Sequence, residues 1–301
     1  MQLRLRLLLA LSLLLVAPAI RAQTDPGAGF AFSVAGDMRS FVGTAPAGKV
    51  YFDGACQALK SIGPGAFMLT PGDCDPLGPV RAVLDHYIGS NYLWYPVVGN
   101  HDVENPDNLA WIANWARAGI PHLSRRGPAG AEFTTYSFDF QNSHFVAVND
   151  YFDGHSETNR ADDLPEATLH WLEQDLSATE QPLVWIYGHK PIKSMPDMNS
   201  GRVRHEKDSI STNAVHLARF LQICRSHHVR AYLCGHTHNA SVTKVQGIWQ
   251  ADSGHCRGGG DPGSPSTFLK IRVAGERAWV EIHRADPNGF NYELRKTVEL
   301  D

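Results

Sequence analysis

The chain has 301 residues, of which 43% are hydrophobic and 19% are charged, and its net charge is −4 at pH 7. This composition excludes a disordered or fibrous chain, and five cysteines are too few for a disulfide scaffold, although one or two bridges could form. The acidic balance and the lack of basic runs argue against a protein that binds a nucleic acid polymer.

The N-terminal segment MQLRLRLLLALSLLLVAPAIRA differs from the rest of the chain. Two arginines precede an apolar stretch that runs from Leu7 to Ala17, and small residues follow. This order is typical of a secretory signal peptide, and the stretch is short for a bilayer span of about 20 residues. We therefore expect residues 1–22 to be cleaved, residues 23–301 to form one domain, and the mature protein to be periplasmic or secreted without a stable membrane span.

From residue 30 onward, short apolar runs alternate with segments of helical periodicity. The expected strands lie at 30–37, 66–73, 93–102, 182–189 and 229–236, with a hairpin over 134–150 that turns near Gln141 and Asn142. The expected helices lie at 49–62, 80–89, 108–119, 165–177 and around 213–227. Residues 240–300 are mostly β, apart from a Gly/Pro-rich loop at 254–265. The pattern indicates an α/β chain with two packed sheets and helices outside.

Five of the expected strands end in a glycine followed by residues that can bind a metal. These residues are Asp37, Asp73, the run Asn100, His101 and Asp102, His189, and the pair His236 and His238. Because ligand sites form at the carboxyl ends of strands, we expect these side chains to meet in one cluster. Carboxylate or amide oxygens combined with imidazole nitrogens suit Zn, Mn, Fe or Ni.

The spacing of the last two histidines has a geometric meaning. Residues two apart in an extended backbone point the same way. We therefore expect His236 and His238 to reach two different ions of an adjacent pair, a pair that can bind phosphate and generate hydroxide.

The ordered motifs GD, GD, GNHD, GH and GHTH resemble the calcineurin-like metallophosphoesterases, which include the purple acid phosphatases and many exported bacterial phosphatases. The resemblance runs from about Phe30 to about Ala251. It implies a four-layer αββα sandwich of two mixed β-sheets flanked by helices. It also implies a small phosphorylated substrate and two divalent or trivalent transition-metal ions, of Fe, Mn or Zn.

The resemblance also implies a role for each matching residue. Asp37 and His238 would bind the first ion, Asp73 would bridge both ions, and Asn100, His189 and His236 would bind the second ion. His101 would face the leaving group, and Asp102 would orient its ring.

The chain departs from the family pattern at the first ion. Arg39 stands where the family usually has a histidine ligand, and Pro76 stands where purple acid phosphatases have a tyrosine. We therefore expect two ions with a weak first site, or an ion that fills the second site alone. Arg39 would either pair with a carboxylate or clamp the substrate phosphate with its planar fork. Asp75 would either support the site or act as an extra ligand.

The sequence thus predicts an exported, metal-dependent phosphoesterase, with phosphomonoesters favoured. A metal-bound hydroxide would attack phosphorus directly, and His101 would act as general acid. Two alternatives stay open. One is a cyclic-nucleotide or other phosphodiesterase, and the other is a non-catalytic phosphate- or nucleotide-binding protein on the same scaffold.

Overall fold

The computed structural model describes residues 29–39, 47–156, 163–210, 212–257, 264–286 and 291–301. The expected signal peptide and the boundary at residue 23 lie outside these residues, so both stay predictions. In the part of the chain that is described, no helix combines the length and the apolar character needed to cross a membrane.

The first sheet has six strands in the order β15-β14-β13-β1-β3-β5. In chain order they are β1 (Phe30–Val34), β3 (Phe67–Thr70), β5 (Leu93–Pro96), β13 (Thr267–Ala274), β14 (Arg277–Ala285) and β15 (Tyr292–Leu300). Strands β1, β3 and β5 run parallel, whereas β13, β14 and β15 are antiparallel. The sheet is therefore mixed, and its parallel half directs three carboxyl ends to the same edge.

The second sheet has seven strands in the order β11-β12-β10-β9-β8-β7-β6. They are β6 (Leu123–Arg126), β7 (Tyr136–Phe140), β8 (Ser143–Ala147), β9 (Leu183–Tyr187), β10 (Val229–Cys234), β11 (Ala240–Val245) and β12 (Ile248–Ser253). Strands β8, β9, β10 and β12 are parallel. A short two-stranded sheet of β2 (Met38–Arg39) and β4 (Cys74–Asp75) lies beside the first sheet.

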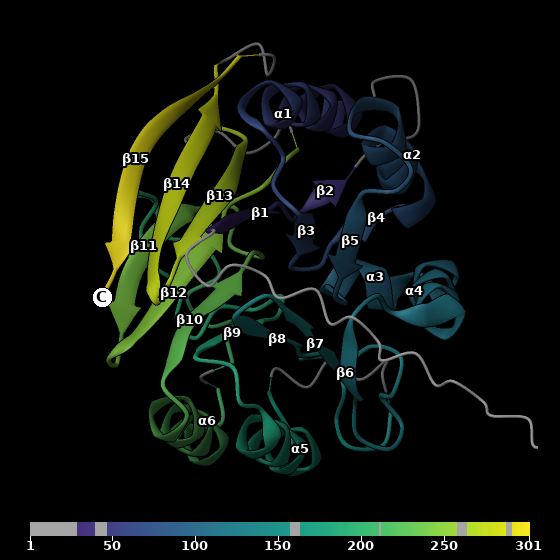
Figure 1. Ribbon diagram of the computed structural model, residues 1–301, viewed down its shortest axis with the longest axis vertical. Helices are drawn as coiled ribbons and strands as arrows, with labels where there is room; N and C mark the ends of the chain where they lie inside the picture. Colours follow the sequence, from purple (N-terminus) through teal and green to yellow (C-terminus); the bar gives the residue numbers. More distant parts are fainter. Residues whose placement is uncertain (1–28, 40–46, 157–162, 211, 258–263, 287–290) are drawn as a thin grey trace, which may run out of the picture.

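Helices cover the outer faces of both sheets (Figure 1). Helices α1 (Ala47–Ile62) and α2 (Leu77–Tyr87) pack on the first sheet, and α5 (Glu166–Ala178) and α6 (Ala214–Ser226) pack on the second. Helices α3 (Asn100–Glu104) and α4 (Pro106–Gly119) follow β5. The expected four-layer αββα sandwich is confirmed.

Aromatic side chains fill the space between the two sheets. Phe32 of β1 and Phe67 of β3 face Phe145 of β8 and Trp185 of β9, with ring centroids 5.2–5.4 Å apart. All four side chains are fully buried. Rings of this size contribute much of the burial energy of a core, and here they hold the two sheets face to face.

The hairpin and the five expected helices are present, with ends shifted by at most three residues. The expected strand 93–102 is wrong in its second half, because β5 ends at Pro96 and Asn100 begins α3. The Asp102 carboxylate accepts the backbone N–H of Gly99 at 2.8 Å and so caps this helix. The short strands β2, β4 and β6 were not anticipated. All five cysteines are buried free thiols, so the disulfides that the composition allowed are not formed.

A buried histidine joins the hairpin to α5 and provides a stability test. His144 Nδ1 lies 2.6 Å from Asp139 Oδ1, and its Nε2 lies 3.0 Å from Asp175 Oδ2. Burial lowers the pKa of His144, but the hydrogen bonds and charges of the two carboxylates outweigh burial and raise that pKa to about 9. The unfolded value is about 6.5, so the stabilisation is complete below that pH and is lost as pH rises through 9.

We expect the free energy of unfolding to fall by about 3 kcal/mol between these pH values because of this one group. Urea unfolding of the wild type and of His144→Gln across the range measures the effect. His170→Gln, which changes an exposed histidine of α5, is the matched control. The assignment is wrong if His144→Gln shows the same pH dependence as the wild type.

Candidate metal centre

The strand-end residues converge on one edge shared by both sheets. Asp37 follows β1, Asp73 follows β3, Asn100 begins α3, His189 follows β9, and His236 and His238 follow β10. The two aspartates and three histidines of this set are at most 5% exposed. The structure therefore brings together six side chains that span 202 positions of the sequence, from 37 to 238.

Three of these residues form the second position, the one expected to hold the second ion. Asn100 Oδ1 lies 3.0 Å from His189 Nε2 and 3.2 Å from His236 Nδ1, and the two nitrogens are 3.1 Å apart. Two ligands at right angles around an ion, each bonded at about 2.1 Å, are about 3.0 Å apart. The spacing fits a single transition-metal ion, with Asp73 Oδ1 a further 3.5 Å from His189 Nε2.

In His189 and His236, one ring nitrogen points away from the second position, and we call it the outer nitrogen. The hydrogen-bond partner of each outer nitrogen determines whether the inner nitrogen presents a lone pair to that position. His189 Nδ1 lies 2.8 Å from the Pro71 carbonyl oxygen, and His236 Nε2 lies 2.8 Å from Asp208 Oδ2. Both partners only accept hydrogen bonds, so each outer nitrogen carries the proton. In the neutral rings, the inner nitrogens then direct lone pairs at each other and at Asn100 Oδ1. Three acceptors converge on a point that only a cation can stabilise.

The charges around His189 favour such a cation. Burial lowers the pKa of His189, but the carboxylates of Asp73, Asp37 and Asp150 outweigh it and raise that pKa to about 9. Burial also raises the pKa of Asp150, to about 6. When no ion is bound, a proton on His189 Nε2 can be donated to Asn100 Oδ1 or His236 Nδ1. A metal ion would replace that proton.

The first position is built on Asp37. Its Oδ2 accepts the backbone N–H of His236 at 3.0 Å, and its Oδ1 lies 3.2 Å from His238 Nε2. Asp37 Oδ1 is buried and has no aligned hydrogen bond among the described residues. Burial raises the pKa of Asp37, but the hydrogen bond and charge of His238 and the charge of His189 hold it well below its usual range. Asp37 Oδ1 can either bind a metal ion or interact with a proton on His238 Nε2.

Asp73 lies between the two positions. Its Oδ1 accepts the backbone N–H of His101 at 2.9 Å, and its Oδ2 lies 3.9 Å from His101 Nε2. Ligand atoms of Asp37, Asp73 and His189 all lie within 4.8 Å of one another. Asp73 is therefore placed where the bridging carboxylate is expected from the sequence.

Four of the predicted ligand residues adopt a left-handed backbone. The φ angles are 55° for Asp37, 56° for Asp73, 68° for His236 and 58° for His238. For residues other than glycine this conformation costs roughly 1–3 kcal/mol each, and it is concentrated at functional sites. The extended backbone expected for the GHTH segment is therefore wrong, although His236 and His238 do face different positions.

Glycines before the ligands allow the loops to approach the carboxylates. A Cβ on Gly99 would lie 2.3 Å from Asp73 Oδ1, and a Cβ on Gly235 would lie 2.3 Å from Asp37 Oδ2. No side chain tolerates contacts this short. At Gly99 and Gly235, close packing against the predicted ligands Asp73 and Asp37 thus explains the glycine of the motif.

The expected contact between Asp102 and the His101 ring is not formed. Asp102 Oδ2 instead accepts the backbone N–H groups of Gly99 and Asp73, both at 2.8 Å. Burial and the charge of Asp73 raise the pKa of Asp102 to about 8. The His101 ring is held by Glu104, whose Oε2 lies 2.7 Å from His101 Nδ1. The sequence signal for Glu104 is its i+3 spacing, which places two side chains together only once the segment is known to be helical.

The structure also shows where Arg39 goes. Its Nη2 lies 3.8 Å from Asp75 Oδ2, and the Asn108 side chain donates to Asp75 Oδ1 at 3.0 Å. Of the two roles expected for Arg39, pairing with a carboxylate is the one observed. Asp75 is held by these two partners.

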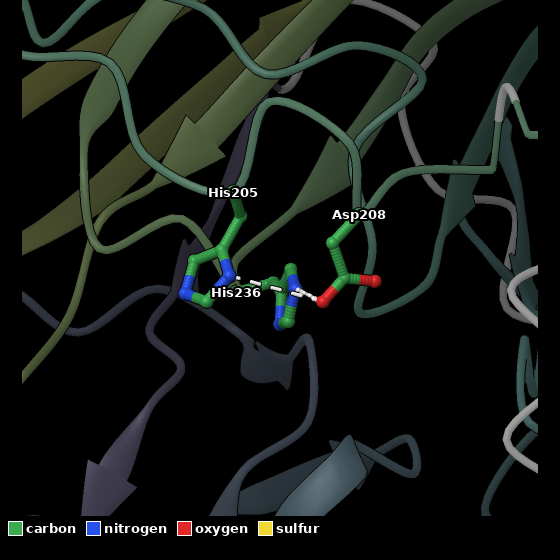
Figure 2. Close-up of side chains that lie close together, drawn as sticks. All are labelled: His205, Asp208 and His236. Atoms are coloured by element: carbon green, nitrogen blue, oxygen red, sulfur yellow. Dashed lines mark hydrogen bonds and ion pairs between the residues drawn. The ribbon is translucent and has the colours of Figure 1, made fainter.

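Residues 202–208, called the strap from here on, cover the centre and were not anticipated. Figure 2 shows His205 and Asp208 of the strap on either side of His236. The His205 and His236 ring centroids are 4.4 Å apart, and Lys190 Nζ lies 2.5 Å from Asp208 Oδ1. Arg204 Nη1 contacts His238 Nδ1. The strap sequence RVRHEKD has neither helical nor strand periodicity, so its placement depends on tertiary packing.

Burial and interactions with neighbouring groups shift pKa values beneath the strap. The hydrogen bond from His236 lowers the pKa of Asp208 below its usual range. Burial lowers the pKa of His236. Burial and the positive charges nearby lower the pKa of His205 to about 4, so this ring is neutral at physiological pH.

Comparison with known proteins identifies the family. Residues 32–240, more than half of the chain, match the family model described as calcineurin-like phosphoesterase. The chain belongs to the calcineurin-like phosphoesterase family. A search of curated proteins found no sequence match. As a member of the family, the chain is a metal-binding hydrolase of phosphoric esters.

Solved structures support the fold of this calcineurin-like phosphoesterase. GAP50, the anchor in the inner membrane complex of Plasmodium, is 14% identical with a TM-score of 0.57, and the alignment covers 91% of this chain and 89% of that one. PhoD is 13% identical with a TM-score of 0.59, covering 91% of this chain and 70% of PhoD. At these identities the likeness concerns the fold alone.

Proposed function

We propose that this calcineurin-like phosphoesterase is an exported phosphomonoesterase. The observation that carries the proposal is the set of three acceptors, Asn100 Oδ1, His189 Nε2 and His236 Nδ1, converging within 3.2 Å of one another. A divalent ion bound by them, with Asp73, would lower the pKa of water and neutralise charge on the phosphoryl oxygens. No covalent phosphoenzyme is needed, because water is the nucleophile.

The residues around this position supply the charge that favours a bound cation and the proton for the leaving group. Asp73 and Asp37 provide the negative charge that favours a bound cation. His101 is partly exposed, with 26% of its side chain accessible, and its Nε2 faces the Asp73 carboxylate across 3.9 Å. From there its imidazole would donate a proton to the departing alkoxide. Glu104 holds the ring through Nδ1, which leaves Nε2 for that proton.

The charges near the centre favour a dianionic monoester over a monoanionic diester. Arg204 lies against His238, and Arg39 is 24% exposed beside Asp75. The Arg204 guanidinium, which contacts His238, suits a phosphate with two negative charges. GAP50 shares the fold and is described as an anchor, so the fold by itself does not establish catalysis, and the ligand set has to carry the proposal.

A paired substrate assay tests the proposal. Purified protein loaded with Mn²⁺ or Zn²⁺ is given 4-nitrophenyl phosphate and bis(4-nitrophenyl) phosphate, with a chelator-treated sample as control. We expect kcat/KM for the monoester to exceed that for the diester by at least about tenfold. A preference for the diester would favour the phosphodiesterase alternative. Metal-loaded protein that hydrolyses neither ester would favour the binding-protein alternative.

Export is supported by the N-terminal segment alone. We expect the mature chain recovered outside the cytoplasm to begin after Ala19 or Ala22. An intact Met1 on the extracytoplasmic protein would contradict cleavage.

A further inference from the structure

The strap places chemically opposite groups on the two histidines of the GHTH motif. Asp208, an acceptor, lies 2.8 Å from the outer nitrogen of His236. Arg204, which only donates, contacts the outer nitrogen of His238. Because each neutral imidazole carries one proton, these neighbours determine which nitrogen of each ring is left to bind a metal.

The neighbours of His236 fix the tautomer that can bind a metal at the second position. Its Nε2–H donates to the Asp208 carboxylate, so its Nδ1 presents a lone pair to the second position. Lys190 in turn holds the other oxygen of Asp208 at 2.5 Å. A carboxylate that orients a ligating histidine in this way raises the basicity of the ligand, and its loss costs about 10–100-fold in metal affinity.

Arg204 fixes the opposite tautomer of His238, in which Nε2 carries the proton. A guanidinium cannot accept a hydrogen bond, so Nδ1 of His238 must accept from Arg204, and the ring proton must be on Nε2. That proton faces Asp37 Oδ1 across 3.2 Å. The nitrogen that faces the first position therefore carries a proton here, 3.2 Å from the buried Oδ1 of Asp37.

Arg39 also weakens metal binding at the first position. It replaces a histidine ligand of the first ion, and it is held by Asp75. Two ligands of the first position are thus lost for separate reasons, one by substitution and one by the proton placed on His238. The second position keeps Asn100, His189 and His236 intact.

We propose that the centre holds one tightly bound ion, at the second position, and that Arg204 excludes the first ion by fixing the proton on His238. Of the two outcomes that the sequence left open, this selects the single ion at the second site over two ions with a weak first site. The inference rests on the proposed function only in that both assume a metal at the second position, because it concerns the number of ions and not the reaction.

Counting Mn²⁺ tests the proposal without reference to activity. The full-length mature protein is saturated with Mn²⁺, freed of excess metal, and analysed by mass spectrometry for metal content and by electron paramagnetic resonance. We expect one Mn²⁺ per chain with the spectrum of an isolated ion. Arg204→Glu places an acceptor on His238 Nδ1, so we expect a second Mn²⁺ and an exchange-coupled spectrum. Arg204→Gln, whose amide oxygen can also accept, serves if the glutamate variant does not fold.

Two variants complete the design. Lys207→Glu makes the same charge change on an exposed residue of the strap and should keep one ion. Asp208→Asn should weaken the single ion about 10–100-fold. The proposal is overturned by a wild type that binds two ions or none, or by glutamate and glutamine variants at Arg204 that stay at one ion. One ion without ester hydrolysis would instead contradict the proposed function and leave this inference standing.

Discussion

Asp73→Ala is expected to remove the bound metal and to lower kcat/KM by roughly 10³-fold or more. The physical reason is the position of this carboxylate, which lies 3.5 Å from His189 Nε2 and is 1% exposed. Its loss removes a ligand and the largest negative charge acting on His189. Metal content and steady-state kinetics measured on the same preparation give the result.

Two further variants distinguish loss of the ligand from misfolding of the Asp73→Ala protein. Asp73→Asn keeps an acceptor for the backbone N–H of His101 and removes only the charge. Asp85→Ala removes a surface carboxylate of α2 that pairs with Arg81, and it should leave both metal content and activity unchanged. Asp73→Ala protein that unfolds at the wild-type temperature yet retains metal and full activity would show that Asp73 is not a ligand.

His101→Ala is expected to separate catalysis from metal binding. The hydrogen bond from the His101 backbone N–H to Asp73 is kept in this variant, and the lost ring lies 3.9 Å from Asp73 Oδ2, so the metal content should stay at the wild-type level. Loss of a general acid should lower kcat by about 10²–10⁴-fold. The loss should be larger for phenyl phosphate than for 4-nitrophenyl phosphate, since the better leaving group needs less protonation.

Glu104 provides the matched variant for this second prediction. Glu104→Gln keeps a side chain of the same size next to His101 Nδ1 but removes its charge, so we expect a smaller fall in kcat with the same dependence on the leaving group. If the loss in His101→Ala were equal for both esters, a role in binding would replace the role as general acid.

The convergence of the predicted ligands could be anticipated from the sequence because each stands at the same place in a repeated pattern. A short apolar run, a glycine and a polar residue recur at Asp37, Asp73, Asn100 and His189, and the parallel order of the strands brings the ends together. Close packing requires the glycine at several of these positions, against Asp73 at Gly99, the His189 ring at Gly72 and the Tyr232 hydroxyl at Gly188. Local pattern and global fold agree at these positions.

The surroundings of the ligands were not predictable in the same way. A carboxylate next to His101 in the sequence is as well placed to accept backbone N–H groups as to hold the ring, and Asp102 does the former. Arg204 and Asp208 act from a segment without periodicity, and their contacts with His236 and His238 arise only from tertiary packing. The left-handed turn at the GHTH motif was likewise not predicted, because even histidine, which is enriched in this conformation, adopts it in only a small share of cases.

Both proposals require Asn100, His189 and His236 to hold a cation at the shared edge of the two sheets. Anomalous X-ray scattering from crystals grown with Zn²⁺, recorded on both sides of the zinc absorption edge, shows whether they do. We predict an anomalous peak bonded to Asn100 Oδ1, His189 Nε2 and His236 Nδ1 at about 2.0–2.2 Å from each. Crystals grown with Zn²⁺ in which the peak lies elsewhere, or in which these three side chains show none, would rule out this metal position.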